Sequence, residues 1–300
     1  MKIRIGTRGS QLALWQAEHV SGLLGRDKTE IIIIKTKGDS IQNVSFEKME
    51  GKGFFTKEIE AALLDRSVDL AVHSLKDLPT DSVPELRLTA VPLREDPSDM
   101  LLINGNAYDP SSDMPLRMGA VVGTSSLRRL AQLKFSRQDL EVKALRGNVN
   151  TRLRKLREGD YDAIVLANAG IRRLDLDLEG LKQFIIPFDI FLPAPAQGAL
   201  GLQTRSDDAV TIRAVEALNH PGSYLAAYAE RSFLRHFGGG CHIPLGALAT
   251  ISDGVIELEG VIASTDGKKS LRYRVKGTDA DTVGAELAKI LKDRGADSLI

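Results

Sequence analysis

Mostly apolar runs alternate with amphipathic stretches along the first two thirds of the chain. The runs at 2–6, 31–35 and 68–74 predict strands that are covered on both faces. Between them, residues 11–24 and 56–65 carry apolar side chains at helical spacing. The same alternation recurs in GAVVGTSS, LRRLAQLKF, LEVKAL, NTRLRKLRE and DAIVLAN, which together cover 119–168. We therefore expect an α/β fold whose sheets are mostly parallel.

Two proline-rich stretches, at 78–99 and 192–201, interrupt this alternation. Because they flank the second α/β unit, they predict two crossings between domains, which can act as hinges. We expect an inserted second domain over 95–194 and a discontinuous first domain over 1–94 and 195–214.

The last part of the chain has a different pattern. Residues 246–277 alternate apolar and polar positions and are broken by the turn sequences SDG and TDG, which is typical of antiparallel hairpins. An amphipathic stretch at 280–295 predicts a closing helix. We expect a small third α+β domain over 215–300.

The composition is that of an ordinary globular protein, with 43% hydrophobic and 27% charged residues among 300. The N-terminus shows no signal peptide, and the apolar runs are too short to span a bilayer, so we expect a cytoplasmic protein that does not bind membranes. Cys241 is the only cysteine, which excludes an internal disulfide.

Charge is balanced overall but concentrated locally. Forty basic and forty acidic residues argue against a generic polyanion binder. Residues 117–173, however, hold ten arginines and three lysines against five acidic residues. This surplus favours a small, bounded anionic ligand.

Three loops follow predicted strands, at 6–10, 73–79 and 123–129, where α/β folds bind ligands. In the third loop, Arg128 and Arg129 fall in the first turn of a predicted helix, where the helix dipole disfavours cations. They are either two solvated arginines or ligands for carboxylates or phosphates.

Other side chains near these loops leave both interpretations open. Thr124, Ser125 and Ser126 are candidate helix caps. Arg146, Arg152 and the arginine pair ending at Arg173 are either a solvated surface or part of a site. The remaining candidates are Arg8, Ser10, Lys76 and Asp77.

Lys76 and Asp77 are adjacent opposite charges, and such pairs are most often solvent-exposed surface residues without a functional role. If Asp77 lies among the arginines, it is the carboxylate there that can move protons.

Cys241 follows three glycines in FGGGCHIPLG at 237–246. It is either a buried small hydrophobe or a tethering or nucleophilic thiol. His236 and His242 do not complete a zinc spacing with it, so we expect no metal. The usual phosphate-loop and dinucleotide fingerprints are missing from the sequence.

Several ordered motifs together resemble the porphobilinogen deaminase (hydroxymethylbilane synthase) family of tetrapyrrole biosynthesis. They are IGTRGSQLALWQA, GKGFFTKEIE, DLAVHSLKDLP, GTSSLRRLAQL, RGNVNTRLRKL, LANAGIRRL, PAQGALG and AERSFLRHFGGGCHIPLGA. The resemblance implies two α/β domains, similar to the halves of periplasmic binding proteins, that flank a cleft. It also implies a small third domain that carries the cysteine.

The resemblance further implies the chemistry. Members carry a dipyrromethane cofactor on a thioether, here at Cys241, and add four porphobilinogen molecules to it head to tail with loss of ammonia. Hydrolysis then releases hydroxymethylbilane. The acetate and propionate groups of each pyrrole account for the local arginine surplus, and family members are monomers.

Residue roles follow from the motif match. It implies that Asp77 is the catalytic carboxylate and that residues 45–55 form a mobile loop over the cleft. The implied cofactor ligands are Lys76, Thr124, Ser126, Arg128 and Arg129, besides Cys241. The implied substrate ligands are Arg8, Ser10, Arg146, Arg152, Arg173 and Gln197. The chain departs from the family pattern at Phe54, Ala196 and His242, which bears on substrate positioning.

Two other functions compete with this interpretation. A solute-binding protein would share the two α/β domains but would not need Cys241. A nucleic-acid binder would need aromatic side chains among the charges, and 117–173 offers only Phe135 and Tyr161. We therefore expect a small-molecule substrate and no nucleic-acid partner.

Overall fold

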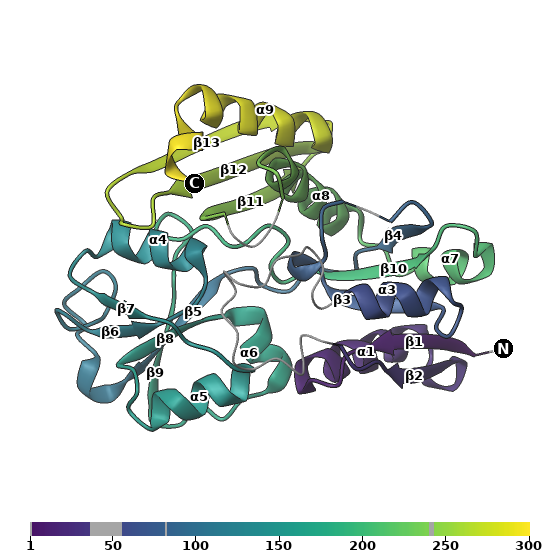
Figure 1. Ribbon diagram of the computed structural model, residues 1–300, viewed down its shortest axis with the longest axis horizontal. Helices are drawn as coiled ribbons and strands as arrows, with labels where there is room; N and C mark the ends of the chain where they lie inside the picture. Colours follow the sequence, from purple (N-terminus) through teal and green to yellow (C-terminus); the bar gives the residue numbers. More distant parts are fainter. Residues whose placement is uncertain (1, 37–55, 82, 240–242) are drawn as a thin grey trace.

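The computed structural model describes residues 2–36, 56–81, 83–239 and 243–300. Its described strands form two five-stranded sheets and one three-stranded sheet. Figure 1 shows the two larger sheets side by side, each with its helices, and the smaller sheet above their junction.

The first sheet has the strand order β2-β1-β3-β10-β4. Strand β1 pairs in parallel with β2 and β3, whereas β10 runs antiparallel to both β3 and β4. Its strands are β1 (Ile3–Thr7), β2 (Thr29–Ile33), β3 (Leu70–Ser74), β4 (Leu86–Ala90) and β10 (Leu200–Arg205). The helices that pack on them are α1 (Gln11–Leu24), α3 (Lys57–Leu64) and α7 (Ala209–Glu216).

The second sheet has the order β7-β6-β8-β5-β9, in which β5 runs antiparallel to β8 and β9. Its strands are β5 (Asp99–Asn104), β6 (Val121–Gly123), β7 (Glu141–Lys143), β8 (Ala163–Ala167) and β9 (Leu181–Ile185). The helices of this part are α4 (Leu127–Ser136), α5 (Val149–Arg157) and α6 (Asn168–Leu174). In each large sheet four strands share one direction and one strand, β10 or β5, opposes them.

The C-terminal part is an antiparallel sheet of β11 (Leu245–Ser252), β12 (Val255–Ala263) and β13 (Ser270–Gly277). Helices α8 (Pro221–His236) and α9 (Ala280–Asp293) pack on it. Phe233, Leu258 and Leu287 are fully buried between the helices and the sheet. The predicted α/β class with a small C-terminal α+β part is confirmed.

The two proline-rich stretches contain strands as well as connections, and the sequence interpretation did not predict these strands. Strand β4 lies inside 78–99, β5 begins at its end, and β10 begins within 192–201. These strands are short and are flanked by proline or glycine. The partners of β10 are distant in the sequence, so the local pattern of apolar and polar residues does not predict these strands. The domain boundaries stay a prediction. Within the described residues, no helix is long and apolar enough to cross a membrane.

A buried ion pair joins the three parts of the chain. Arg94 lies between β4 and β5, and its Nη1 is 2.7 Å from Glu230 Oε1 on α8. Glu230 also accepts hydrogen bonds from the backbone N–H groups of Ala196 and Ala249, and Arg94 Nε donates to the carbonyl of Gln197. Both ionic side chains are largely excluded from solvent. Because a buried ion left without its partner is costly, this contact fixes the crossings next to the candidate site.

Candidate active site

Gln197 connects the two larger sheets at the candidate site. Strand β3 leads into the 3₁₀ helix η3 (Leu75–Asp77), which carries Lys76 and Asp77. Lys76 Nζ is 3.3 Å from Gln197 Oε1, and Gln197 Nε2 is 2.9 Å from Asp99 Oδ1 at the start of β5. Gln197 is fully buried. The predicted substrate ligand therefore lies between groups from both domains, and in this structure its amide hydrogen-bonds with protein groups.

Helix α4 begins as predicted, with Ser126 as its N-cap and Arg128 and Arg129 in its first turn. Both arginines bind Asp99. Arg128 Nη1 lies 2.6 Å from Asp99 Oδ2, and Arg129 Nη2 lies 2.7 Å from Asp99 Oδ1. The two arginines are only 5% and 6% exposed, so the alternative of two solvated arginines is wrong.

Asp99 is the residue at this site that the sequence interpretation missed. Burial alone would raise the pKa of its carboxyl group, but the charges and hydrogen bonds of Arg128 and Arg129 outweigh burial and hold that pKa well below its usual range. An acidic residue at the start of a buried strand was the available signal. Its pairing with α4 depends on tertiary structure, which local patterning does not reveal.

The guanidinium groups also bind backbone carbonyls. Arg128 Nη1 donates to the carbonyl of Leu192, and Arg129 Nη1 donates to that of Val165. The Nε atom of Arg128 is buried without a hydrogen-bond partner among the described residues. A guanidinium has five N–H donors, so the pair retains hydrogen-bonding capacity beyond its contacts with Asp99.

Charges from both domains act on one another around Asp77. Burial lowers the pKa of Lys76 to about 8; Asp77 raises it and Arg129 lowers it. Burial likewise lowers the pKa of Arg152 to about 10, with Arg129 lowering it further and Asp77 raising it. Asp77 itself is exposed. The structure thus brings four predicted site residues, Lys76, Asp77, Arg129 and Arg152, into one electrostatic cluster.

The predicted hydroxyl ligands have local partners. Ser10 is the N-cap of α1 and accepts from the N–H of Ala13 at 3.3 Å. Thr124 is buried, and its Oγ1 accepts from the N–H of Ser126 at 3.2 Å. Ser126 in turn caps the N–H of Arg129. These hydroxyls form the helix starts, and their roles as ligands stay predictions.

The remaining predicted arginines are Arg8, Arg146 and Arg173. Arg173 is buried on α6, donates to the carbonyl of Gly198 at 2.6 Å, and lies over the ring of Trp15 on α1. Burial lowers the pKa of Arg173 to about 10. Arg152 Nε donates to the carbonyl of Gly147. Arg8 and Arg146 are half-buried.

Several predictions fall outside the described residues. They concern Cys241, His242 and the segment 45–55, which includes Phe54. In the described part of the chain, no group of three or more His, Cys, Asp or Glu side chains could hold a metal ion. Ala196 is described and has φ +61, a conformation that glycine adopts without strain.

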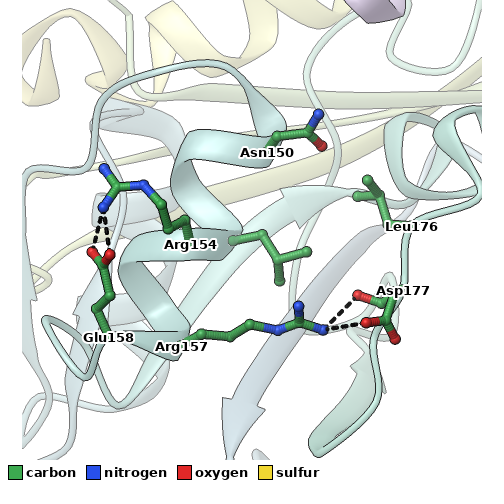
Figure 2. A pocket seen from close by; sticks show the side chains of 7 residues that line it. Asn150, Arg154, Arg157, Glu158, Leu176 and Asp177 are labelled. Atoms are coloured by element: carbon green, nitrogen blue, oxygen red, sulfur yellow. Dashed lines mark hydrogen bonds and ion pairs between the residues drawn. The ribbon is translucent and has the colours of Figure 1, made fainter.

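A pocket of about 420 Å³ lies beside α5. Figure 2 shows its charged side chains turned toward one another: Arg154 pairs with Glu158, and Arg157 with Asp177. None of the predicted site residues lines this pocket. We therefore place the candidate active site at the cluster around Asp77 and Asp99.

The fold and the cluster define a three-part α/β protein with a cationic site where its two larger sheets meet. Residues 3–213 match the family model "Porphobilinogen deaminase, dipyromethane cofactor binding domain", and residues 224–293 match "Porphobilinogen deaminase, C-terminal domain". The chain belongs to the porphobilinogen deaminase family.

Curated relatives and solved structures give further similarities. The chain is 46% identical to porphobilinogen deaminase of Syntrophomonas wolfei, over 99% of this chain and 97% of that protein. It is 43% identical to the Nostoc sp. porphobilinogen deaminase, over 99% of this chain and 93% of that protein. Among solved structures, a periplasmic sulfonate-binding protein from Methylobacillus flagellatus is 13% identical with a TM-score of 0.40, covering 77% of this chain and 68% of that one.

Proposed function

We propose that this protein is a hydroxymethylbilane synthase, a transferase that condenses four porphobilinogen molecules head to tail with loss of ammonia. The product would be released by hydrolysis as hydroxymethylbilane. The observation that carries this proposal is the match of both family domains over nearly the whole chain. The cationic cluster supports it, because the substrate bears two carboxylates.

A dipyrromethane group on Cys241 is part of the proposal, and the described residues fit such a group. Lys76, Arg128, Arg129 and Arg152 outnumber the carboxylates of Asp77 and Asp99 at the cluster. The Nε of Arg128 is a buried donor that has no acceptor within 2–36, 56–81, 83–239 and 243–300. Lys76, Thr124, Ser126, Arg128 and Arg129 would hold the carboxylates of this group, which supplies the pyrrole end to which substrate is joined.

Asp77 is the proposed catalytic acid and base. Its carboxylate is exposed and lies beside cationic side chains from both domains. There it would give a proton to the leaving amino group of porphobilinogen, offset positive charge on the pyrrole, and later take a proton from the ring carbon. General acid–base catalysis of this kind contributes roughly 10²–10⁴ in rate.

The proposed substrate ligands would orient the incoming molecule. Each charge-assisted hydrogen bond to a substrate carboxylate contributes about 1.5–3 kcal/mol. The residues assigned to this role are Arg8, Ser10, Arg146, Arg152, Arg173 and Gln197. Gln197 Nε2 donates to the carbonyl of Pro97, and Arg173 donates to the carbonyl of Gly198. Because the first bond joins the two crossings between the larger sheets and the second joins α6 to one of them, the two side chains would couple substrate position to the arrangement of the domains.

The variant Asp77→Asn tests the catalytic role. It keeps the size of the side chain and removes the ionisable group, so we expect a folded protein whose kcat for porphobilinogen falls by about 10² or more. The matched control is Asp113→Asn, which changes an exposed carboxylate of the second domain away from the cluster. A kcat of Asp77→Asn close to that of the control would remove Asp77 from the mechanism.

We further propose that the enzyme is a cytoplasmic monomer that does not bind nucleic acid. Light scattering after size-exclusion chromatography tests the monomer, and a salt-dependent binding assay with DNA and RNA tests the second point.

A further inference from the structure

Arg231, on α8 of the C-terminal part, binds the loop that carries Lys76 and Asp77. Its Nη1 donates to the carbonyls of Leu78 at 2.7 Å and Leu75 at 3.1 Å. Its Nη2 donates to the carbonyl of Pro79 at 2.7 Å. One guanidinium thus joins three carbonyls that bracket the 3₁₀ helix η3.

The loop has few hydrogen bonds of its own that could fix it. Within η3 and its cap, the N–H of Leu78 reaches the carbonyl of Leu75 at 3.3 Å. The N–H of Leu75 is anchored to the carbonyl of Ala199 on the other side. A single short turn leaves its carbonyls unsatisfied, and the planar guanidinium fork holds several acceptors in one fixed geometry.

The segment that follows α8 contacts the end of the same loop. A Cβ atom at Gly239 would overlap Oγ1 of Thr80, so the end of the loop lies directly against Gly239. Gly239 precedes Cys241 by two residues. Arg231 therefore binds the loop close to the point where the chain continues to the proposed attachment residue.

The partners of Arg231 all belong to the loop that carries Lys76 and Asp77. Its hydrogen bonds within the described residues all go to backbone carbonyls of 75–79. Arg235, one turn further along α8, pairs instead with Asp281 inside the C-terminal part. Two arginines on one helix therefore bind different parts, and only Arg231 reaches the candidate active site.

We infer that Arg231 is a positioning residue, which holds the Lys76–Asp77 loop in register with the C-terminal part that carries Cys241. The inference rests on the proposed function. Arg231 does not touch the reacting atoms, and it acts through the placement of Asp77. A misplacement of about 1 Å can lower a rate 10²-fold, so loss of the three hydrogen bonds should appear mainly in kcat.

The test compares Arg231→Gln and Arg231→Lys with the matched control Arg235→Gln in the cofactor-loaded full-length enzyme. We expect kcat for porphobilinogen to fall about 10- to 100-fold in Arg231→Gln, with KM within about threefold of wild type. Arg231→Lys keeps the charge without the fork and should lie between Arg231→Gln and wild type. Arg235→Gln should stay within about twofold of wild type, because its partner lies away from the loop.

A second readout separates positioning from a loss of general stability. Amide hydrogen exchange of residues 74–80 should become faster in Arg231→Gln, while exchange in β12 stays as in wild type. If Arg231→Gln does not fold, Arg231→Lys is measured in the same two ways.

Two results would overturn the inference: equal kcat values for Arg231→Gln and Arg235→Gln, or unchanged exchange at 74–80. A wild-type protein without turnover of porphobilinogen would instead refute the proposed function, and the exchange comparison would still show whether Arg231 holds the loop.

Discussion

Replacing Asp99 by Asn removes one negative charge from the centre of the candidate site and leaves the side-chain shape almost unchanged. The Asp99 side chain is 0% exposed, and the side chains of Arg128 and Arg129 are 5% and 8% exposed. The variant would leave two buried guanidinium groups without their counter-ion. It would also turn an amide group, which is partly a donor, toward their N–H groups.

The expected cost follows from this burial. Breaking a buried ion pair by removing one partner costs about 3–5 kcal/mol, because the remaining charge stays desolvated. The control Glu158→Gln breaks the ion pair with Arg154. The side chain of Arg154 is 61% exposed and that of Glu158 is 48% exposed. Exposed pairs contribute about 0–1 kcal/mol, so this control should change the free energy of unfolding far less.

Urea denaturation followed by far-ultraviolet circular dichroism measures both variants. The pKa of Asp99 is lowered in the folded state, so its stabilising contribution is present above the unfolded pKa of about 3.9 and is lost only as pH falls through the folded value. The difference between wild type and Asp99→Asn should therefore be the same at pH 7 and pH 5. A loss below about 1 kcal/mol, equal to that of Glu158→Gln, would refute the role of Asp99 as the buried counter-ion.

Two more predictions concern the residues around the site. Gly198 has φ +85, and a Cβ atom there would overlap the carbonyl oxygen of Glu95. The variant Gly198→Ala should therefore lower the free energy of unfolding by more than about 2 kcal/mol. Gly180→Ala, at φ +79 with open space around it, should cost only about 1–2 kcal/mol in the same denaturation assay, and equal losses would contradict the overlap. Burial lowers the pKa of His73 to about 4, so the unfolded chain binds more protons between pH 6.5 and 4 and wild type loses stability as pH falls. Relative to His73→Gln, wild type should lose about 2 kcal/mol between pH 7 and pH 5, and parallel stability curves would show that His73 is not buried in its neutral form.

The sequence predicted the parts of the fold that depend on local pattern. Helices α1, α4 and α9 and the hairpins from β11 to β13 follow from the spacing of apolar residues and from turn residues. Strands β5 and β10 were missed because each is defined by antiparallel partners distant in the sequence. Helix α8 also went unpredicted, although it supplies Glu230 and Arg231 to the junction.

The candidate site was predicted in the same partial way. Two arginines in the first turn of α4 contradict the helix dipole, and this contradiction left two interpretations open, solvated arginines or ligands for a bound carboxylate or phosphate. The structure shows a third partner, the buried carboxylate of Asp99, which pattern and spacing could not place. The role of the two arginines as ligands stays a prediction. The contacts of Gln197 and Arg173 at the crossing likewise depend on how the domains meet, so motif positions named these residues without showing their partners.

The intact mass of the purified, denatured protein tests the central claim most directly. We expect an excess over the mass calculated from the sequence that equals two linked pyrrole units, located by peptide mapping on Cys241. Incubation with porphobilinogen should load any unmodified fraction. A chain that keeps its calculated mass after this incubation would contradict the account and favour a protein that binds its ligand without covalent chemistry.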